Sequence, residues 1–113
     1  EHGAQTATIN MDLGENYPIS NIEEFLIAFK ADNTYAKIYT VEFSADGQNF
    51  QEMVNVKDAK YKTVMENKID QSAYNYDTVR YVRVKLNDGS YNWGYQISEV
   101  AIMGSDVYMP VEP

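Results

Sequence analysis

The sequence has no cysteine and a single histidine, and it holds fewer basic than acidic residues. Without cysteine the chain can form neither a disulfide nor a thiolate metal site, and a cysteine nucleophile is excluded. The histidine, His2, stands near the start of the chain, where an imidazole is rarely held firmly enough for a catalytic triad. The net charge of −8 argues against nucleic acid and anionic membranes as partners, because both favour a basic surface.

The sequence also lacks the patterns of a membrane span, a catalytic carboxylate pair and a phosphate loop. No apolar run is long enough for a bilayer-spanning helix. Glu23 and Glu24 are adjacent, so on a strand they point to opposite faces and cannot flank one glycosidic bond. No glycine-rich loop precedes a helix, and the spacing from Asp70 to Asp77 lacks the pattern of a calcium-binding EF-hand loop. The residues therefore predict a protein that is not an enzyme.

Tyrosine is the residue type in clearest excess. The chain has 113 residues, enough for one domain, and ten of them are tyrosine. This excess fits β-structure, in which tyrosine packs well, and it also fits a binding face that stacks flat ligands. The composition leaves both interpretations open.

Alternation of apolar and polar residues with a period of two dominates the sequence, and helical periodicity is weak. Together with short turns, this alternation predicts an all-β antiparallel sandwich or barrel. In the most regular strand, Arg80 is expected on the same face as Val82 and Val84, opposite to Val79. Seven strands are predicted, at residues 6–13, 19–29, 36–44, 49–56, 61–69, 78–86 and 95–103.

Three local features refine this pattern. Asp46 and Gly47 predict a hairpin turn, because Asp-Gly accepts the positive φ that tight turns need. Residues 14–16 read as a turn between the first two strands. The alternation slips near Glu23 and Glu24, which indicates a bulge in the second strand.

The ends of the predicted sandwich can be told apart by parity. Successive antiparallel strands reverse direction, so odd and even connections fall at opposite ends. One end is expected to collect residues 15–18, 45–48 and 70–77. The other end is expected to collect the N-terminal residues and residues 30–35, 57–60 and 87–94.

The second of these ends gathers flat aromatic rings, amides, charges and the imidazole. Sugars are bound by such a mixture, because the C–H-rich face of a pyranose stacks on a ring while its hydroxyls bond amides, carboxylates and cations. We therefore predict a sugar site at this end. Its candidate residues are Trp93, Tyr91, Asn92, Asn33, Asp32, Lys30, Tyr35 and His2.

Structural roles compete with this interpretation. Trp93 stands just before a strand and would equally well cap the core of the sandwich, and Tyr35 would pack on its own loop. The polar residues of the 30–35 loop would form an ordinary solvated turn. Arg80 and Arg83 are expected to pair with acidic neighbours on the sheet rather than bind a ligand.

Four short motifs occur in order along the chain: MDLG at 11–14, YTVEFSADGQNF at 39–50, VRYVRV at 79–84 and WGYQISEVAIMG at 93–104. Together they resemble the discoidin-like family, which includes the coagulation-factor type C domains and the family-32 carbohydrate-binding modules. The family pattern is DLG, then Y-x-I-x-x-S-x-D-G-x-x-W, then A-R-Y-V-R, then I-x-E-I-x-V-x-G. The resemblance implies a jelly-roll β-sandwich like that of galactose-binding domains, with the ligand loops of sugar-binding members at the end that bears Trp93.

The chain departs from this family in two places. Phe50 stands where a tryptophan is usual, which keeps the aromatic packing. The family also has a segment before the DLG strand that builds a structural calcium loop, and here only ten residues precede Met11. Glu99 matches a family position that can reach calcium, so the resemblance implies a structural calcium there. The alternative for Glu99 is a carboxylate satisfied by strand-end amides or by an arginine.

The absence of that segment would leave one sheet edge uncovered. Residues 1–104 are expected to form the domain and residues 105–113 a tail or linker. Because uncovered edges recruit other strands, we expect either a dimer or added strand pairing from 105–113, with Val107 and Met109 facing the core.

The leading functional hypothesis is a non-catalytic carbohydrate-binding module of an extracellular or cell-surface bacterial protein such as a glycoside hydrolase. It would bind a terminal sugar of the galactose or N-acetylhexosamine type and tether the larger protein to glycans. The alternatives are an adhesion or protein-binding discoidin domain and a structural spacer without a ligand. Membrane binding is disfavoured by the net charge and the polar loops.

Overall fold

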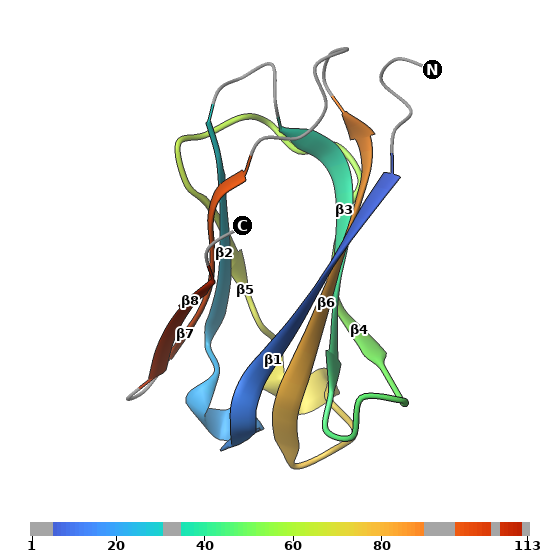
Figure 1. The fold of residues 1–113 in the computed structure, drawn as a ribbon, viewed down its shortest axis with the longest axis vertical. Coiled ribbons are helices and arrows are strands. Elements are labelled where there is room, and N and C mark those ends of the chain that lie inside the picture. The colour runs from blue at the N-terminus through green and yellow to red at the C-terminus, as the bar shows by residue number, and fades with distance from the viewer. Residues whose placement is uncertain (1–5, 31–34, 90–96, 105–106, 112–113) are drawn as a thin grey trace.

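Two antiparallel sheets of four strands each face one another in the computed structural model, which describes residues 6–30, 35–89, 97–104 and 107–111 (Figure 1). Sheet A has the order β1 (Thr6–Pro18), β6 (Thr78–Gly89), β3 (Ala36–Ser44) and β4 (Gln51–Val56). Sheet B has the order β5 (Met65–Lys68), β2 (Glu24–Phe29), β7 (Ile97–Gly104) and β8 (Val107–Val111). The predicted antiparallel β-sandwich is confirmed.

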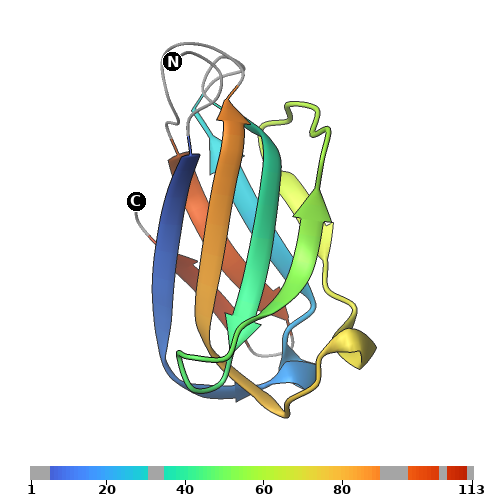
Figure 2. The same cartoon turned by 90° about the vertical axis from the view of Figure 1, so that its right-hand side faces the viewer.

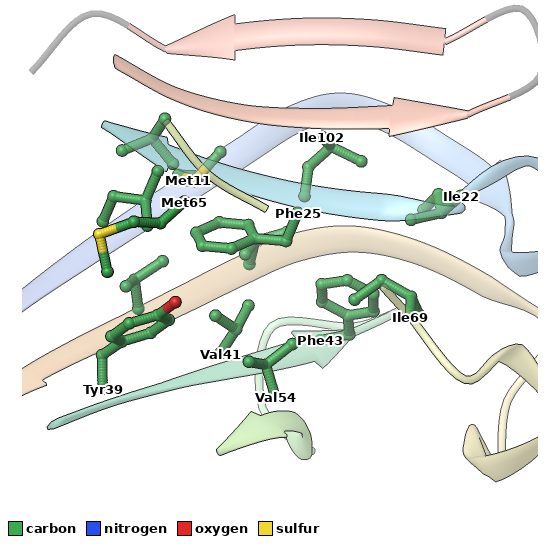
Figure 3. Close-up of a cluster of buried hydrophobic side chains, with 14 of the residues drawn as sticks. Met11, Ile22, Phe25, Tyr39, Val41, Phe43, Val54, Met65, Ile69 and Ile102 are labelled. Carbon is green, nitrogen blue, oxygen red and sulfur yellow. The ribbon is translucent and has the colours of Figure 1, made fainter. Parts of the chain in front are cut away.

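The core lies between the two sheets and is built from alternate residues of their strands. Figure 2 shows sheet A in front of sheet B, and Figure 3 shows the apolar side chains that fill the space between them. Phe25 of β2 and Phe43 of β3 are both fully buried there. Alternate strand residues point to one face, so Tyr39 and Val41 share the buried face of β3 with Phe43.

The first strand is longer than predicted, because residues 14–16 do not form a turn. β1 continues to Pro18 and stays paired with β6 after a register shift between Asp12 and Tyr17. Within this bulge Gly14 has φ +90°, and its N–H donates to Oδ1 of Asp12 at 2.8 Å. The glycine therefore allows the extra residues to loop out of the ladder instead of reversing the chain.

Because of the same bulge, two residues of β6 face the opposite way from the prediction. Asp12 lies opposite Tyr81 and Tyr17 opposite Val79, so the extra residues of β1 face Arg80 alone. Val79 is fully buried, whereas Arg80 points outward to an ion pair with Asp12. The prediction that Arg80 shares the face of Val82, with Val79 opposite, is therefore wrong.

Three of the other predicted strands are shorter in the structure, and the one predicted at 49–56 covers only Gln51–Val56. The segment predicted as a strand at 19–29 begins with a short 3-10 helix, η1 (Ile19–Asn21), and only Glu24–Phe29 forms β2. The segment predicted at 61–69 forms a strand only over Met65–Lys68. Residues 70–77, predicted as irregular, contain a second 3-10 helix, η2 (Gln71–Ala73). Among the described residues no helix has the length and hydrophobicity needed to cross a bilayer.

The connections fall at two opposite ends, as parity predicts (Figure 1). We call one of them the hairpin end; it comprises residues 15–22, 45–50 and 70–77. The other, the predicted-site end, comprises residues 30, 35 and 57–61 and the strand ends at Gly89 and Ile97.

Side-chain hydrogen bonds join the segments of the hairpin end to one another. Nδ2 of Asn16 donates to the carbonyl oxygen of Ala45 at 3.3 Å and to Oγ1 of Thr78 at 3.0 Å. Nε2 of Gln71 donates to the carbonyl oxygens of Ser20 and Ile22, so η2 is fixed against η1. These bonds close the hairpin end of the core.

The C-terminal part of the chain adds an eighth strand. β8 pairs antiparallel with β7, from Val100 opposite Val111 to Gly104 opposite Val107. The strand pairing expected for residues 105–113 is therefore present. The side chains expected to face the core, Val107 and Met109, are not among those described.

Gly104 ends β7 where the backbone of the η1 segment passes very close. A Cβ at this position would overlap the carbonyl oxygen of Asn21 and lie 2.9 Å from the backbone nitrogen of Glu23. That nitrogen donates to the carbonyl oxygen of Met103 at 2.8 Å, which holds the two segments together. This approach is the physical reason for a glycine at the end of the last sequence motif.

We predict that Gly104→Ala destabilises the fold by about 3 kcal/mol or more, because backbone atoms must move to admit the methyl group. Gly14→Ala is the comparison, since no atom lies within 4 Å of its added Cβ and the cost is confined to the left-handed φ, about 1–2 kcal/mol. Urea unfolding of both variants measures the difference. Equal losses in the two variants would contradict the close approach at Gly104.

Removal of residues 105–113 is expected to lower the free energy of unfolding by roughly 2–5 kcal/mol, since each lost backbone hydrogen bond contributes about 0.5–1.5 kcal/mol. The truncated chain should also self-associate, because β7 becomes an uncovered edge. A chain ending at Val111 keeps β8 and serves as the control. Thermal melting and light scattering measure the two effects, and a stable monomer without residues 105–113 would contradict this prediction.

Candidate functional site

At the predicted-site end, two loop segments start and finish on neighbouring strands. Residues 30–35 connect β2 to β3, and residues 90–96 connect β6 to β7. Phe29 lies opposite Ile97 in sheet B, and Ala36 lies opposite Gly89 in sheet A. The strand ends that flank residues 30–35 are therefore paired with the strand ends that flank residues 90–96.

Few of the predicted site residues fall in the described part of the chain. Lys30 is exposed, directly after the end of β2. Tyr35 is half-buried, and its ring centroid lies 5.6 Å from that of Tyr61. The other predicted residues lie outside the described residues: His2, Asp32, Asn33, Tyr91, Asn92 and Trp93.

Tyr61 is a residue of this end that the sequence analysis assigned to a strand. The segment before it is fixed by the N–H of Ala59, which donates to the carbonyl oxygen of Lys37 at 2.8 Å. Tyr61 then packs its ring on Tyr35 at an interplanar angle of 57°. Parity predicts residues 57–60 at this end. Extending that connection by one residue would have included Tyr61.

Glu99 is the residue that the family resemblance proposes as a calcium ligand. Glu99 is half-buried on β7, opposite Ala28 of β2. Nowhere in the described ranges do three or more His, Asp or Glu side chains gather in a way that could hold a metal ion. Calcium binding through Glu99 stays a prediction.

A hollow of about 430 Å³ lies on the outer face of sheet A, at the hairpin end. A second hollow, of about 250 Å³, lies beside Tyr39 of β3 and Asn67 of β5 and is lined largely by residues 59–66. Lys30, Tyr35 and Glu99 line neither of them. The larger hollow is lined by Asn10, Met11, Asp12, Asp46, Gly47, Gln48, Phe50, Tyr81 and Val82.

One wall of the larger hollow is organised by the β1 bulge. Nε of Arg80 donates to Oδ1 of Asp12 at 2.9 Å, and the guanidinium lies 5.3 Å from the centroid of the Tyr81 ring. The same ring lies over Gly47, so close that a Cβ on this glycine would be 3.2 Å from ring carbon Cε2. Hydrogen bonds from Arg80 and from the N–H of Gly14 hold the pKa of Asp12 below its usual range. Asp12 is therefore an anion with two internal donors.

The other aromatic ring of this hollow, Phe50, is covered by Arg83. The guanidinium carbon lies 3.9 Å from the Phe50 ring centroid, and Nε donates to Oε1 of Glu42 at 2.6 Å. Arg80 and Arg83 thus pair with acidic neighbours on the sheet, as predicted. Phe50 thus keeps aromatic packing at the position where the sequence resemblance leads us to expect a tryptophan.

Asp46 holds the hairpin turn together from the centre. Its Oδ1 accepts hydrogen bonds from the Ser44 hydroxyl at 3.0 Å and from the N–H groups of Gln48 and Asn49 at 2.8 and 2.9 Å. Its Oδ2 accepts one from Nδ2 of Asn49 at 2.7 Å. These donors, above all the backbone N–H groups, hold the pKa of Asp46 well below its usual range. Gly47 has φ +82°, as the hairpin prediction required.

The comparisons with known proteins agree with the motifs in the sequence. Residues 1–100 match the family model described as the F5/8 type C domain. Among curated proteins, none matches the chain in sequence.

Several solved structures share the fold. The module CpGH89CBM32-5 from Clostridium perfringens, in complex with GalNAc-β-1,3-galactose, has a TM-score of 0.68 at 18% identity, covering 89% of this chain and 68% of that one. CBM32-3 from a family 31 glycoside hydrolase of the same organism has a TM-score of 0.67 at 14% identity, covering 91% and 69%. Chitosan-binding module 1 from a chitosanase/glucanase of Paenibacillus sp. IK-5 has a TM-score of 0.57 at 17% identity, covering 85% and 70%.

We predict that the Asp46 carboxylate contributes stability that depends on pH. Because its folded pKa is lowered, this contribution is complete above the unfolded pKa of about 3.9 and is lost as pH falls below that value. Asp46→Asn should therefore lower the melting temperature equally at pH 7 and pH 5, and by a smaller amount at pH 3. Melting curves at the three pH values measure this, and a constant difference would contradict the role of the charge.

Proposed function

The chain belongs to the F5/8 type C domain family, and from that premise we propose that it is a non-catalytic carbohydrate-binding module. Its ligand is a terminal sugar of the galactose or N-acetylhexosamine type, bound at the predicted-site end. Two structural relatives support this proposal, since one is in complex with GalNAc-β-1,3-galactose and the other with GlcNAc-α-1,4-galactose.

One observation on this chain supports the proposed place of the site. The 30–35 and 90–96 segments have both of their ends paired, through Phe29 with Ile97 and Ala36 with Gly89. In the proposal, this pairing of the strand ends allows residues that are distant in the sequence to bind one ligand. In the proposal Trp93 or Tyr91 stacks on a sugar ring, and Asn33, Asn92, Asp32 and Lys30 bind its hydroxyls. His2 is proposed as a further residue of this site.

The packing of Tyr35 on Tyr61 gives this site a fixed base in the proposal. Both rings are half-buried and pack against the hydrophobic core, so the 30–35 segment is anchored where it enters β3. A sugar site built on such an anchor loses less conformational entropy when the sugar binds, which favours a higher affinity.

The proposed biological role is tethering. A weak sugar site raises the effective concentration of a linked catalytic domain at its substrate without taking part in catalysis. The parent protein is proposed to be an extracellular or cell-surface bacterial protein, of the kind represented by the glycoside hydrolase that contains one of the structural relatives.

We expect sugar affinity on the order of 0.1–1 mM, because a shallow site exchanges water hydrogen bonds for protein ones at a small net gain. Titration of the labelled chain with galactose, N-acetylgalactosamine and N-acetylglucosamine, followed by amide NMR shifts, should move resonances at the predicted-site end. Tyr91→Ala and Asn33→Ala should each lower the affinity about two- to tenfold and leave the melting temperature unchanged.

The matched controls are Tyr76→Ala and Asn75→Ala, which remove the same side chains from exposed positions at the hairpin end. Neither should change the affinity for the sugars. If no sugar moves any resonance at millimolar concentration, the proposal fails and the adhesion or spacer role takes its place.

A further inference from the structure

We propose that the larger hollow on the outer face of sheet A is a second ligand site, and that it takes one neutral sugar ring. The hollow lies at the hairpin end, whereas the proposed loop site lies at the other end of a molecule 39 Å long. Its volume of about 430 Å³ is within the range of small-ligand pockets. The inference stands on this hollow alone and does not depend on the loop site.

The charges around the hollow already have partners within the protein. Asp12 is paired with Arg80, and Asp46 accepts four hydrogen bonds from its own turn. Arg83, beside the hollow, is paired with Glu42. A charged ligand would have to displace one of these partners, whereas a neutral ligand would not. The hollow therefore favours an uncharged molecule.

Two side-chain amides on the rim, by contrast, have no hydrogen-bond partner among the described residues. The side chains of Asn10 and Gln48 are exposed, and neither makes a hydrogen bond within the described structure. Asn10 comes from β1 and Gln48 from the turn between β3 and β4, so they stand on either side of Tyr81 of the intervening β6. Each primary amide offers two donors and an acceptor, a combination suited to the vicinal hydroxyls of a sugar.

The aromatic surface between the amides is held in place before any ligand arrives. Tyr81 is fixed by its contact with Gly47 and by the Arg80 guanidinium. Phe50 is covered by Arg83, which Glu42 holds in turn, so Phe50 forms a fixed wall and Tyr81 is the proposed stacking ring. A rigid aromatic surface flanked by free amides fits a ligand with one flat C–H-rich face and a ring of hydroxyls. A pyranose has this form.

Titration of the labelled full chain with methyl β-D-galactopyranoside and methyl β-D-glucopyranoside tests this site. Amide resonances of Asn10, Gly47, Gln48 and Tyr81 should shift with millimolar sugar. Asn10→Ala and Gln48→Ala should each weaken the response about two- to tenfold, with an unchanged melting temperature because neither side-chain amide is hydrogen-bonded to another described residue. Asn75→Ala, an exposed amide of the same end that does not line the hollow, should have no effect.

The stacking surface is tested with Tyr81→Phe, which keeps the ring, and Tyr81→Leu, which removes it; only the second should abolish the response. Shifts at the hollow that persist in Tyr91→Ala support a second site and separate it from the proposed loop site. Shifts confined to the predicted-site end overturn this inference and leave the proposed function intact. Shifts at the hollow that keep their full size in both amide variants also overturn it. The absence of any shift there with either glycoside overturns it as well.

Discussion

The register of β6 between β1 and β3 determines which side chains of sheet A enter the core. Val82 and Val84 point inward, so their neighbours Arg83 and Lys85 point outward toward Glu42. At the bulge the alternation is broken, and both Arg80 and Tyr81 reach the outer face. The core and the aromatic cluster on the outer face therefore depend on the same set of backbone pairs, because a slip of one residue would exchange the two faces.

Much of the fold could be predicted from the period of the sequence. The bounds of β3 were predicted as residues 36–44 and are observed as Ala36–Ser44, because apolar and polar residues alternate from Tyr39 to Phe43 and the strand ends at a strong turn signal. The errors lie where an extra residue or a helical turn breaks the period, as at Gly14 and at η1. A bulge is defined by how one strand pairs with its partner, so the sequence of one strand alone does not predict it.

The two candidate sites differ in how well they could be predicted from the sequence. The loop site follows from parity, which needs only the order of the strands, and the described strand ends lie where parity places them. The hollow on sheet A depends on which residues of β1, β6 and the hairpin stand side by side. Asn10, Gln48 and Tyr81 are separated widely in the chain, and neither composition nor spacing indicates that they meet.

The bulge in β1 also bears on how the chain behaves when it is crowded against other proteins. Within the described strands β1 pairs only with β6, so its outer row of N–H and C=O groups could act as a template for a foreign strand or a growing fibril. The looped-out residues around Gly14 interrupt that row, and Pro18 has no N–H to offer. Only the straight part from Thr6 to Asp12 remains as a template, and the charge of Asp12 stands at its end. The β1 bulge, which shapes the outer face, therefore also disfavours aggregation through this edge.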